Sequence, residues 1–224
     1  MCMGIRTILI LCADCDAGFR LAQIAGRSDH RAIAGIRRHT EAARYHRLGA
    51  DTARIDPTDR ADVDSMFAEL DPDGLAVISV LGGSPQMNTQ GNLNVINAAY
   101  AAGVERFLLV SSIGCGDSAG AVDEFVKVFV GKALTAKTWA ERQLQTTDMD
   151  WTIVRAGGML RRNFKGGAIL IDSNTVSGHI SPVDLGDAVF RALVSDKTTR
   201  RVLAAVDAED AYETSGREVI AVDI

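Results

Sequence analysis

The chain has 224 residues, 47% of them hydrophobic and 24% charged, with a net charge of -5 and a pI of about 5.4. This composition is typical of a folded protein with a sizeable core and argues against an intrinsically disordered chain. The acidic balance argues against a nucleic acid or an anionic membrane as the main partner, because either would require a basic face. We therefore expect a small-molecule substrate as the partner, and a homodimer is left open.

Targeting signals are not evident in the sequence. Residues 1–6 lead directly into a predicted strand, without the longer apolar core and small-residue cleavage site of a secretory signal. No apolar run is long enough for a membrane-spanning helix. We expect a cytoplasmic protein in which Cys2, Cys12, Cys15 and Cys115 are reduced.

Apolar runs of strand length alternate with amphipathic stretches of helix length up to about residue 156. This alternation predicts βαβ units and a parallel sheet covered on both faces. The strands are predicted at residues 7–11, 31–36, 51–55, 75–80, 106–110 and 151–155. The clearest helices are predicted at residues 90–102, where Gly103 acts as the C-cap, and at about 133–146.

The alternation breaks after residue 156. Glycine pairs and the turn sequence Asp172-Ser173-Asn174 predict a loop and a short hairpin over residues 157–181. This insertion follows the carboxyl end of a strand, where open α/β sheets bind ligands. We expect it to form one wall of a substrate pocket, with Met159, Leu160 and Phe164 lining an apolar cavity; an ordinary core role for these three residues is left open.

A helix at residues 182–194 and a strand at 201–206 are predicted to complete the sheet. The chain then forms a single domain over residues 1–224. It consists of a nucleotide-binding core at 1–156, the substrate-side insertion at 157–181 and a closing helix and strand at 182–224.

The turn after the first strand is the most informative feature. A dinucleotide-binding fold keeps three glycines there, and this chain has Cys12, Cys15 and Gly18 at those places. The cysteines add side chains where a pyrophosphate needs bare backbone. Asp14 and Asp16 add negative charge, and one carboxylate about 5 Å from a phosphate costs on the order of 3 kcal/mol at an effective dielectric of about 20. Asp16 is alternatively the N-cap of the next helix.

Cys12 and Cys15 also form a C-x-x-C sequence between a strand and a helix. That spacing supports thiol–disulfide exchange. The neighbouring aspartates oppose a thiolate, so the sequence favours the cysteines as small replacements for glycine. A zinc site is disfavoured because Cys2 and Cys115 do not form a second pair at ligand spacing.

Three segments together resemble the atypical short-chain dehydrogenase/reductases, in particular the NmrA-like and biliverdin-reductase-B-like NAD(P)-binding proteins. They are AAGVERFLLVSSIG at residues 101–114, AKTWAERQL with MDWTIVR at 136–144 and 149–155, and GHISPVDLGDA at 178–188. The resemblance covers nearly the whole chain. It implies an α/β fold with a doubly wound parallel sheet of the Rossmann type, which hosts reductases, epimerases and nucleotide sensors alike.

The resemblance also implies a set of cofactor-binding residues. Arg37 would bind the ribose 2'-phosphate with support from Arg38, which favours NADP(H) over NAD(H). Asp56 would lie near the adenine. The others would be Gly18 and Phe19 at the turn and Leu81 and Gly82 after the fourth strand. Solvated surface roles for Arg37 and Arg38 are left open.

Two residues are the catalytic candidates by the same resemblance. Ser112, more than Ser111, would lie near a substrate carbonyl, and Lys137 matches the lysine of the family's Tyr-x-x-x-Lys pair. The tyrosine position is Ala133, so no phenol is available to relay a proton. The alternatives are a strand end for the serines and, for Lys137, a solvated pair with Glu141. His179 is a further candidate proton donor.

The sequence leaves two functions open. One is an NADP(H)-linked oxidoreductase that acts on a small carbonyl-containing or planar metabolite and binds its cofactor weakly. The other is a scaffold derived from the same family that has lost dinucleotide binding and serves as a cofactor-independent enzyme or a ligand-sensing protein.

Overall fold

A computed structural model describes residues 4–37, 42–161 and 166–224. Its main sheet has eight strands in the order β3-β2-β1-β4-β5-β6-β11-β8. The strands are β1 Thr7–Leu11, β2 Arg31–Ile36, β3 Ala50–Arg54, β4 Leu75–Ser79, β5 Arg106–Ser112, β6 Asp150–Ala156, β8 Ala168–Ile171 and β11 Arg201–Asp207. All neighbouring pairs are parallel except β11 and β8. The doubly wound α/β fold predicted from the sequence is confirmed.

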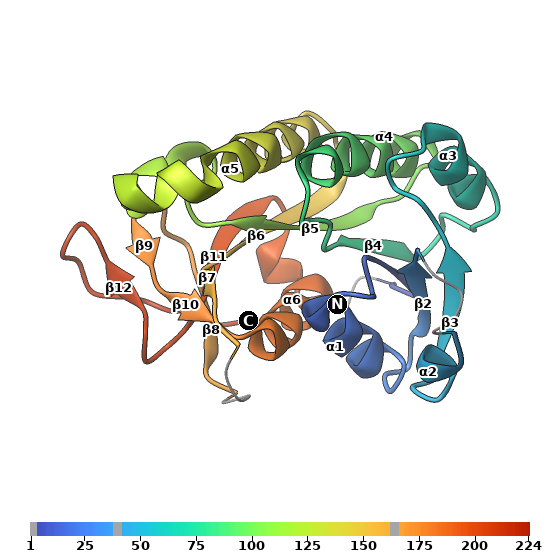
Figure 1. Cartoon of the computed structure of the whole chain (residues 1–224). Coiled ribbons are helices and arrows are strands. Elements are labelled where there is room, and N and C mark those ends of the chain that lie inside the picture. The colour runs from blue at the N-terminus through green and yellow to red at the C-terminus, as the bar shows by residue number, and fades with distance from the viewer. Residues whose placement is uncertain (1–3, 38–41, 162–165) are drawn as a thin grey trace.

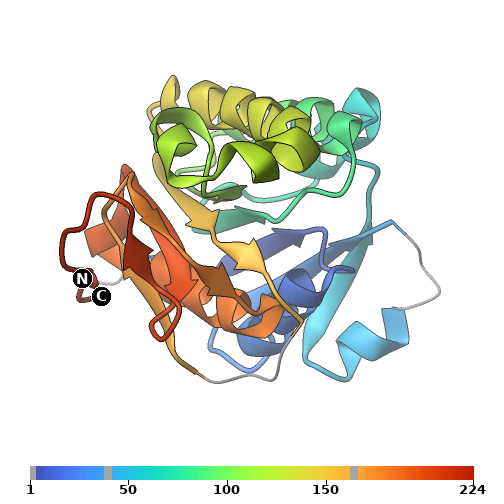
Figure 2. The same ribbon diagram turned by 60° about the vertical axis from the view of Figure 1, so that its left-hand side comes forward.

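Helices cover both faces of this sheet, as Figures 1 and 2 show. One layer contains α1 Asp16–Ala25, α2 Ala42–His46 and α6 Pro182–Val194, and the other contains α3 Arg60–Ala68, α4 Asn92–Ala101 and α5 Glu124–Gln145. Each face has its own apolar core. No helix in the described ranges is long and apolar enough to cross a membrane.

Two helix starts differ from those predicted. The helix α5 begins at Glu124, well before residue 133, and its first turns carry the exposed side chains of Phe125, Val128 and Phe129. These residues extend beyond the sheet, so they do not follow the burial period on which the prediction rested. A π-helical turn at Met87–Gly91 precedes α4. The predicted C-cap is confirmed: Gly103 has φ +82°, and the N–H of Val104 donates to the Ala99 carbonyl.

The predicted hairpin within residues 157–181 is wrong. Strand β8 pairs with β11, so β8 and not the strand at 201–207 forms this edge of the main sheet. The next strand, β9 Val176–Ser177, pairs instead with β12 Tyr212–Glu213, and β7 Gly158–Met159 pairs with β10 His179–Ile180. The turn at 172–174 thus joins strands of different sheets, because each finds its partner far along the chain.

The turn between β1 and α1 is tightly built. Cys12 has φ +64°, a left-handed conformation that favours glycine. The N–H of Cys15 donates to the Cys12 carbonyl at 3.2 Å. Cys15 is the N-cap of α1 and its Sγ accepts from the Gly18 N–H at 3.3 Å, so Asp16 is the first helical residue and not the cap. A Cβ on Gly18 would lie 2.2 Å from the Cys12 carbonyl oxygen.

This contact predicts a large difference between two glycine substitutions. Gly18→Ala should lower the free energy of unfolding by about 1–3 kcal/mol, because the methyl group has only backbone to displace. Gly131→Ala is the matched control, since Gly131 lies in α5 with nothing within 4 Å of its Cβ position. It should raise stability by about 0.5–1 kcal/mol. Urea unfolding measures both, and equal effects would show that the close approach at Gly18 is not a constraint.

Candidate functional site

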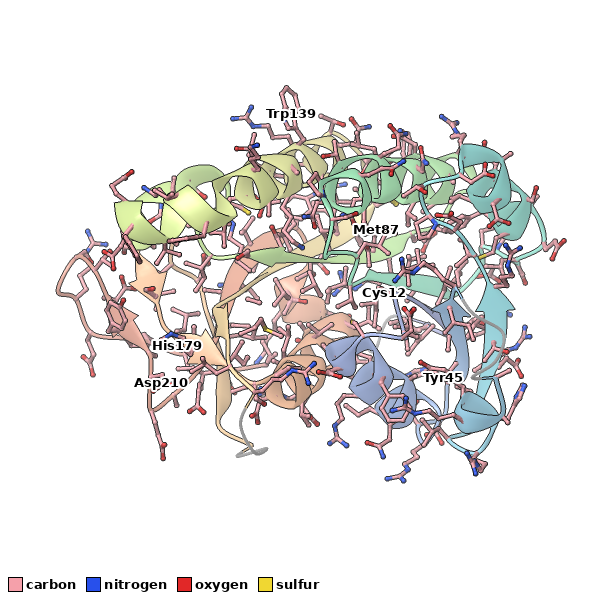
Figure 3. All side chains as sticks on the ribbon, viewed as in Figure 1. Cys12, Tyr45, Met87, Trp139, His179 and Asp210 are labelled. Atoms are coloured by element: carbon pink, nitrogen blue, oxygen red, sulfur yellow. The ribbon has the colours of Figure 1, made fainter. Side chains whose placement is uncertain are left out.

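A cavity of about 610 Å³ lies at the carboxyl ends of β1, β4, β5 and β6. It extends from the β1–α1 turn to the end of β5. Its lining includes Cys12, Cys15, Asp16, Arg37, Leu81, Gly82, Ser111, Ser112, Lys137 and Met159. A narrower cleft continues from the same turn past Ile55 and Pro57 to Met87, and the view in Figure 3 shows Met87 close to Cys12. The cavity therefore occupies the edge at which doubly wound sheets bind ligands.

Arg37 lines both the cavity and the cleft, as expected for a phosphate-binding residue. Its Nε lies 3.7 Å from Oδ2 of Asp14, which lines the cleft too. Asp16 similarly lies 3.2 Å from Nη2 of Arg161. These two arginines thus partly compensate the acidic charge of the turn. An anion that binds Arg37 must share this guanidinium with Asp14.

Asp56 is the residue that the family resemblance places near the adenine. Asp56 lies beside the cleft between Ile55 and Pro57, and Oδ1 accepts hydrogen bonds from the hydroxyl and N–H of Thr58. These bonds, together with the charges of Arg37 and Arg54, lower the pKa of Asp56. Asp56 itself lines neither the cavity nor the cleft.

Besides Asp56, the predicted cofactor residues Phe19 and Gly18 line neither the cavity nor the cleft in the described part of the chain. Phe19 contributes to neither wall, and its ring packs edge-on against Tyr45 with centroids 5.7 Å apart. Arg38 lies outside the described residues. Gly18 acts through the backbone: it allows α1 to approach the Cys12 carbonyl.

Lys137 connects two strand ends at the centre of the cavity. Its Nζ donates to the Leu81 carbonyl at 3.3 Å and the Val110 carbonyl at 3.0 Å. The side chain is half-buried, and desolvation lowers the pKa of Lys137. Glu141 instead accepts from Arg155 at 2.8 Å. Lys137 is therefore not the solvated partner of Glu141 that the sequence left open.

Two buried polar atoms face this region without a strong partner. Ser111 Oγ lies beside the Cys115 thiol, a weak hydrogen-bonding group, and has no other partner among the described residues. Asn88 Oδ1 is likewise unsatisfied within the described part of the chain, and it lies 3.7 Å from the Cβ position of Gly82. Buried polar atoms are rarely left unpaired, so these two indicate where a ligand or water binds. The sequence analysis missed Asn88 because nothing in the sequence marks its π-helical turn.

Ser112 stands where the first cavity meets a second one of about 510 Å³. Both cavities share Ser112, Lys137, Gly157 and Met159. Apolar side chains dominate the second cavity: Ile113, Ala121, Val122, Val126, Val130, Ala133 and Leu134. The Ser112 Oγ donates to the Ile113 carbonyl at 3.1 Å. The site therefore has a cofactor-sized cavity and an adjoining apolar one, with Ser112 and Lys137 at the junction.

Residues of the insertion line the second cavity. They are Gly157, Gly158, Met159, Gly178 and His179, and His179, which lies in β10, is labelled in Figure 3. Leu160 is 42% exposed and lines neither cavity, and Phe164 lies outside the described residues.

Ala133 lines the second cavity one helical turn before Lys137, so the missing phenol leaves open space there. The sequence analysis missed Val126 and Val130, which follow the same face of α5. Their spacing of three or four residues, continued to Ala133 and Lys137, is the helical signal that an earlier helix start would have revealed.

A family model described as NAD(P)H-binding matches residues 17–196. ChuY of Escherichia coli O157:H7, described as an anaerobillin reductase, is 27% identical and superposes with a TM-score of 0.82, covering 91% of this chain and 98% of that one. The uncharacterized chloroplastic protein At2g34460 of Arabidopsis thaliana is 28% identical over 72% of this chain. The match spans 64% of the Arabidopsis protein's length, which is less than two thirds. YhfK of Bacillus subtilis, an uncharacterized sugar epimerase, is 24% identical over 87% of this chain and 91% of its own.

Proposed function

This chain belongs to the NAD(P)H-binding family, and from that premise we propose that it is an NADP(H)-linked oxidoreductase acting on a small planar or carbonyl-containing metabolite. The observation that carries the proposal is the continuity of the cavity. It runs from Arg37 and the β1–α1 turn to Ser112 and Lys137, where the apolar second cavity begins.

The residues present fit a dinucleotide, except at the β1–α1 turn, where Asp14 adds negative charge and the two cysteines add bulk. Cys12 keeps the left-handed backbone and Gly18 the close approach that such a turn requires. The first turn of α1 would bind the pyrophosphate, since helix N-termini favour anions. Arg37 would bind the 2'-phosphate, while Leu81 and Gly82 would border the cofactor. The cysteine side chains and Asp14 oppose this binding, so the affinity is weak.

The chemistry at the junction suits reduction of a polarised double bond. Bound NADPH would supply the hydride. The Ser112 hydroxyl can donate a hydrogen bond to a substrate oxygen, and the nearby Lys137 ammonium stabilises negative charge that develops there. Because Ala133 supplies no phenol, the proton comes from water or from His179, which lines the same cavity.

The lining of the second cavity favours a reductase over a sugar epimerase. Val126, Val130 and Met159 present apolar surface, which suits a planar, weakly polar molecule more than a sugar with many hydroxyl groups. The description of ChuY as a reductase supports the same choice.

A second candidate is a ligand-binding or cofactor-independent protein that has lost its dinucleotide. The contact between Asp14 and Arg37 favours it, because the Asp14 carboxylate, 3.7 Å from Nε of Arg37, would repel a 2'-phosphate bound there. Dinucleotide binding separates the two candidates.

Calorimetric titration of the purified protein tests the proposed cofactor. We expect NADPH to bind more weakly than the low micromolar range, and to bind at least about tenfold more tightly than NADH because Arg37 recognises the 2'-phosphate. Arg37→Gln should abolish this preference. Arg31→Gln is the matched control, because Arg31 is exposed on β2 and pairs with Asp51 away from the cavity. Equal binding of NADPH and NADH would remove Arg37 from its role, and no binding of either would favour the second candidate.

Restoring the turn should restore affinity. The triple variant Cys12→Gly, Asp14→Thr and Cys15→Gly removes two side chains and one negative charge, and it should bind NADPH at least about tenfold more tightly than the wild type. The added glycines should lower stability somewhat through backbone entropy. A correctly folded variant with unchanged affinity would place the obstacle elsewhere in the cavity.

A further inference from the structure

Cys12 and Cys15 lie together in the wall of the larger cavity as free thiols. The hydrogen bond from the Cys15 N–H to the Cys12 carbonyl closes a turn from residue i to residue i+3. Such a turn brings its end Cα atoms within about 7 Å, and disulfides join Cα atoms about 4.4–6.8 Å apart. Each thiol shifts the pKa of the other, so their side chains lie near one another. The closed turn thus places the two Cα atoms at a separation compatible with a disulfide.

The environment makes the two thiols unequal. Hydrogen bonds from the Cys12 thiol and from the Gly18 N–H lower the pKa of Cys15, although burial, Asp14 and Asp16 act in the opposite direction. The bond to Cys15, burial and the nearby negative charges raise the pKa of Cys12. Because the thiolate is the nucleophile, Cys15 is the attacking residue of the pair and Cys12 the resolving one.

We propose that Cys12 and Cys15 form a reversible disulfide that weakens cofactor binding at the β1–α1 turn. The oxidant is a low-molecular-weight disulfide. The effect on the cofactor rests on the proposed function above, whereas formation of the disulfide does not.

The reaction balances as two successive exchanges. The Cys15 thiolate attacks one sulfur of the small disulfide, forms a mixed disulfide and releases one thiolate. Cys12 then attacks the Cys15 sulfur, and the second thiolate leaves with the Cys12 proton. Two protein thiols are oxidised and one small disulfide is reduced to two thiols. Excess small thiol reverses both steps.

The disulfide acts on the site through the start of α1. A bond to Cys12 draws the Cys15 sulfur to about 2.05 Å from the Cys12 sulfur and so changes its position relative to the Gly18 N–H that it now caps. The paired sulfurs then lie fixed across the turn, in the cavity wall where a pyrophosphate would approach. The coupling is reciprocal, so a bound dinucleotide must also disfavour the disulfide at equilibrium.

Mass spectrometry tests the disulfide without any dinucleotide. The reduced protein is treated with oxidised glutathione, quenched in acid, alkylated with N-ethylmaleimide and digested with trypsin. The peptide of residues 7–20 contains Cys12 and Cys15 and no other cysteine. We expect this peptide to lose two hydrogens and to escape alkylation, and to become alkylated again after reduction. A peptide that remains doubly alkylated under these conditions would overturn the proposal.

Single variants test the assigned roles. Cys12→Gly, which suits the positive φ, should stop at a glutathione adduct on Cys15. Cys15→Ser keeps an N-cap oxygen and should leave Cys12 without an adduct. Cys115→Ala removes a buried thiol outside the turn and should form the disulfide like the wild type. An adduct on Cys12 in the Cys15→Ser variant would contradict the assignment of the attacking thiol.

Calorimetry with NADPH tests the effect on the cofactor site. We expect the oxidised protein to bind NADPH at least tenfold more weakly than the reduced protein. Equal affinities would overturn control by the disulfide. If neither form binds NADPH although the peptide is oxidised, the proposed function fails. Formation of the disulfide is then supported, and its effect on a cofactor is not.

Discussion

The packing of α1 against the end of β1 is the constraint on which the site depends. Gly18 approaches the Cys12 carbonyl so closely that a Cβ would lie 2.2 Å from it, and Cys12 adopts a left-handed backbone to allow this approach. Together they direct the first turn of α1 at the cavity. The chain therefore keeps the backbone path of a dinucleotide-binding turn while two cysteine side chains and Asp14 change its chemistry. Under the proposed function, the backbone of this turn would hold the dinucleotide, and these side chains would weaken its binding.

Charges around the cavity are compensated locally, with one exception. Asp14 lies against Arg37, and Glu141 binds Arg155. Lys137, by contrast, is held by the carbonyl oxygens of Leu81 and Val110. Its positive charge therefore stands where the two cavities meet, beside Ser112. In the proposed function, this arrangement would stabilise a substrate oxygen that becomes negative, which would give Lys137 a role even though Ala133 stands at the tyrosine position.

The sequence predicted the parallel sheet well because its strands are short apolar runs buried on both faces, and the family resemblance is confirmed by the match over residues 17–196. Prediction failed where partners lie far apart, since strand β8 pairs with β11. It also failed in the first half of α5, where the exposed apolar side chains of Phe125, Val128 and Phe129 obscure the helical spacing of Val126 and Val130. The contact between Asp14 and Arg37 joins the ends of neighbouring strands. These two charges were weighed separately from the sequence, although a predicted βαβ unit places the ends of its two strands side by side.

A crystal structure of the reduced protein grown with saturating NADP+ tests the central claim most directly. The account predicts the pyrophosphate at the first turn of α1, the 2'-phosphate beside Arg37, and the nicotinamide at the junction of the two cavities near Ser112 and Lys137. A nucleotide bound elsewhere on the protein, or a nicotinamide directed away from Ser112, would contradict it.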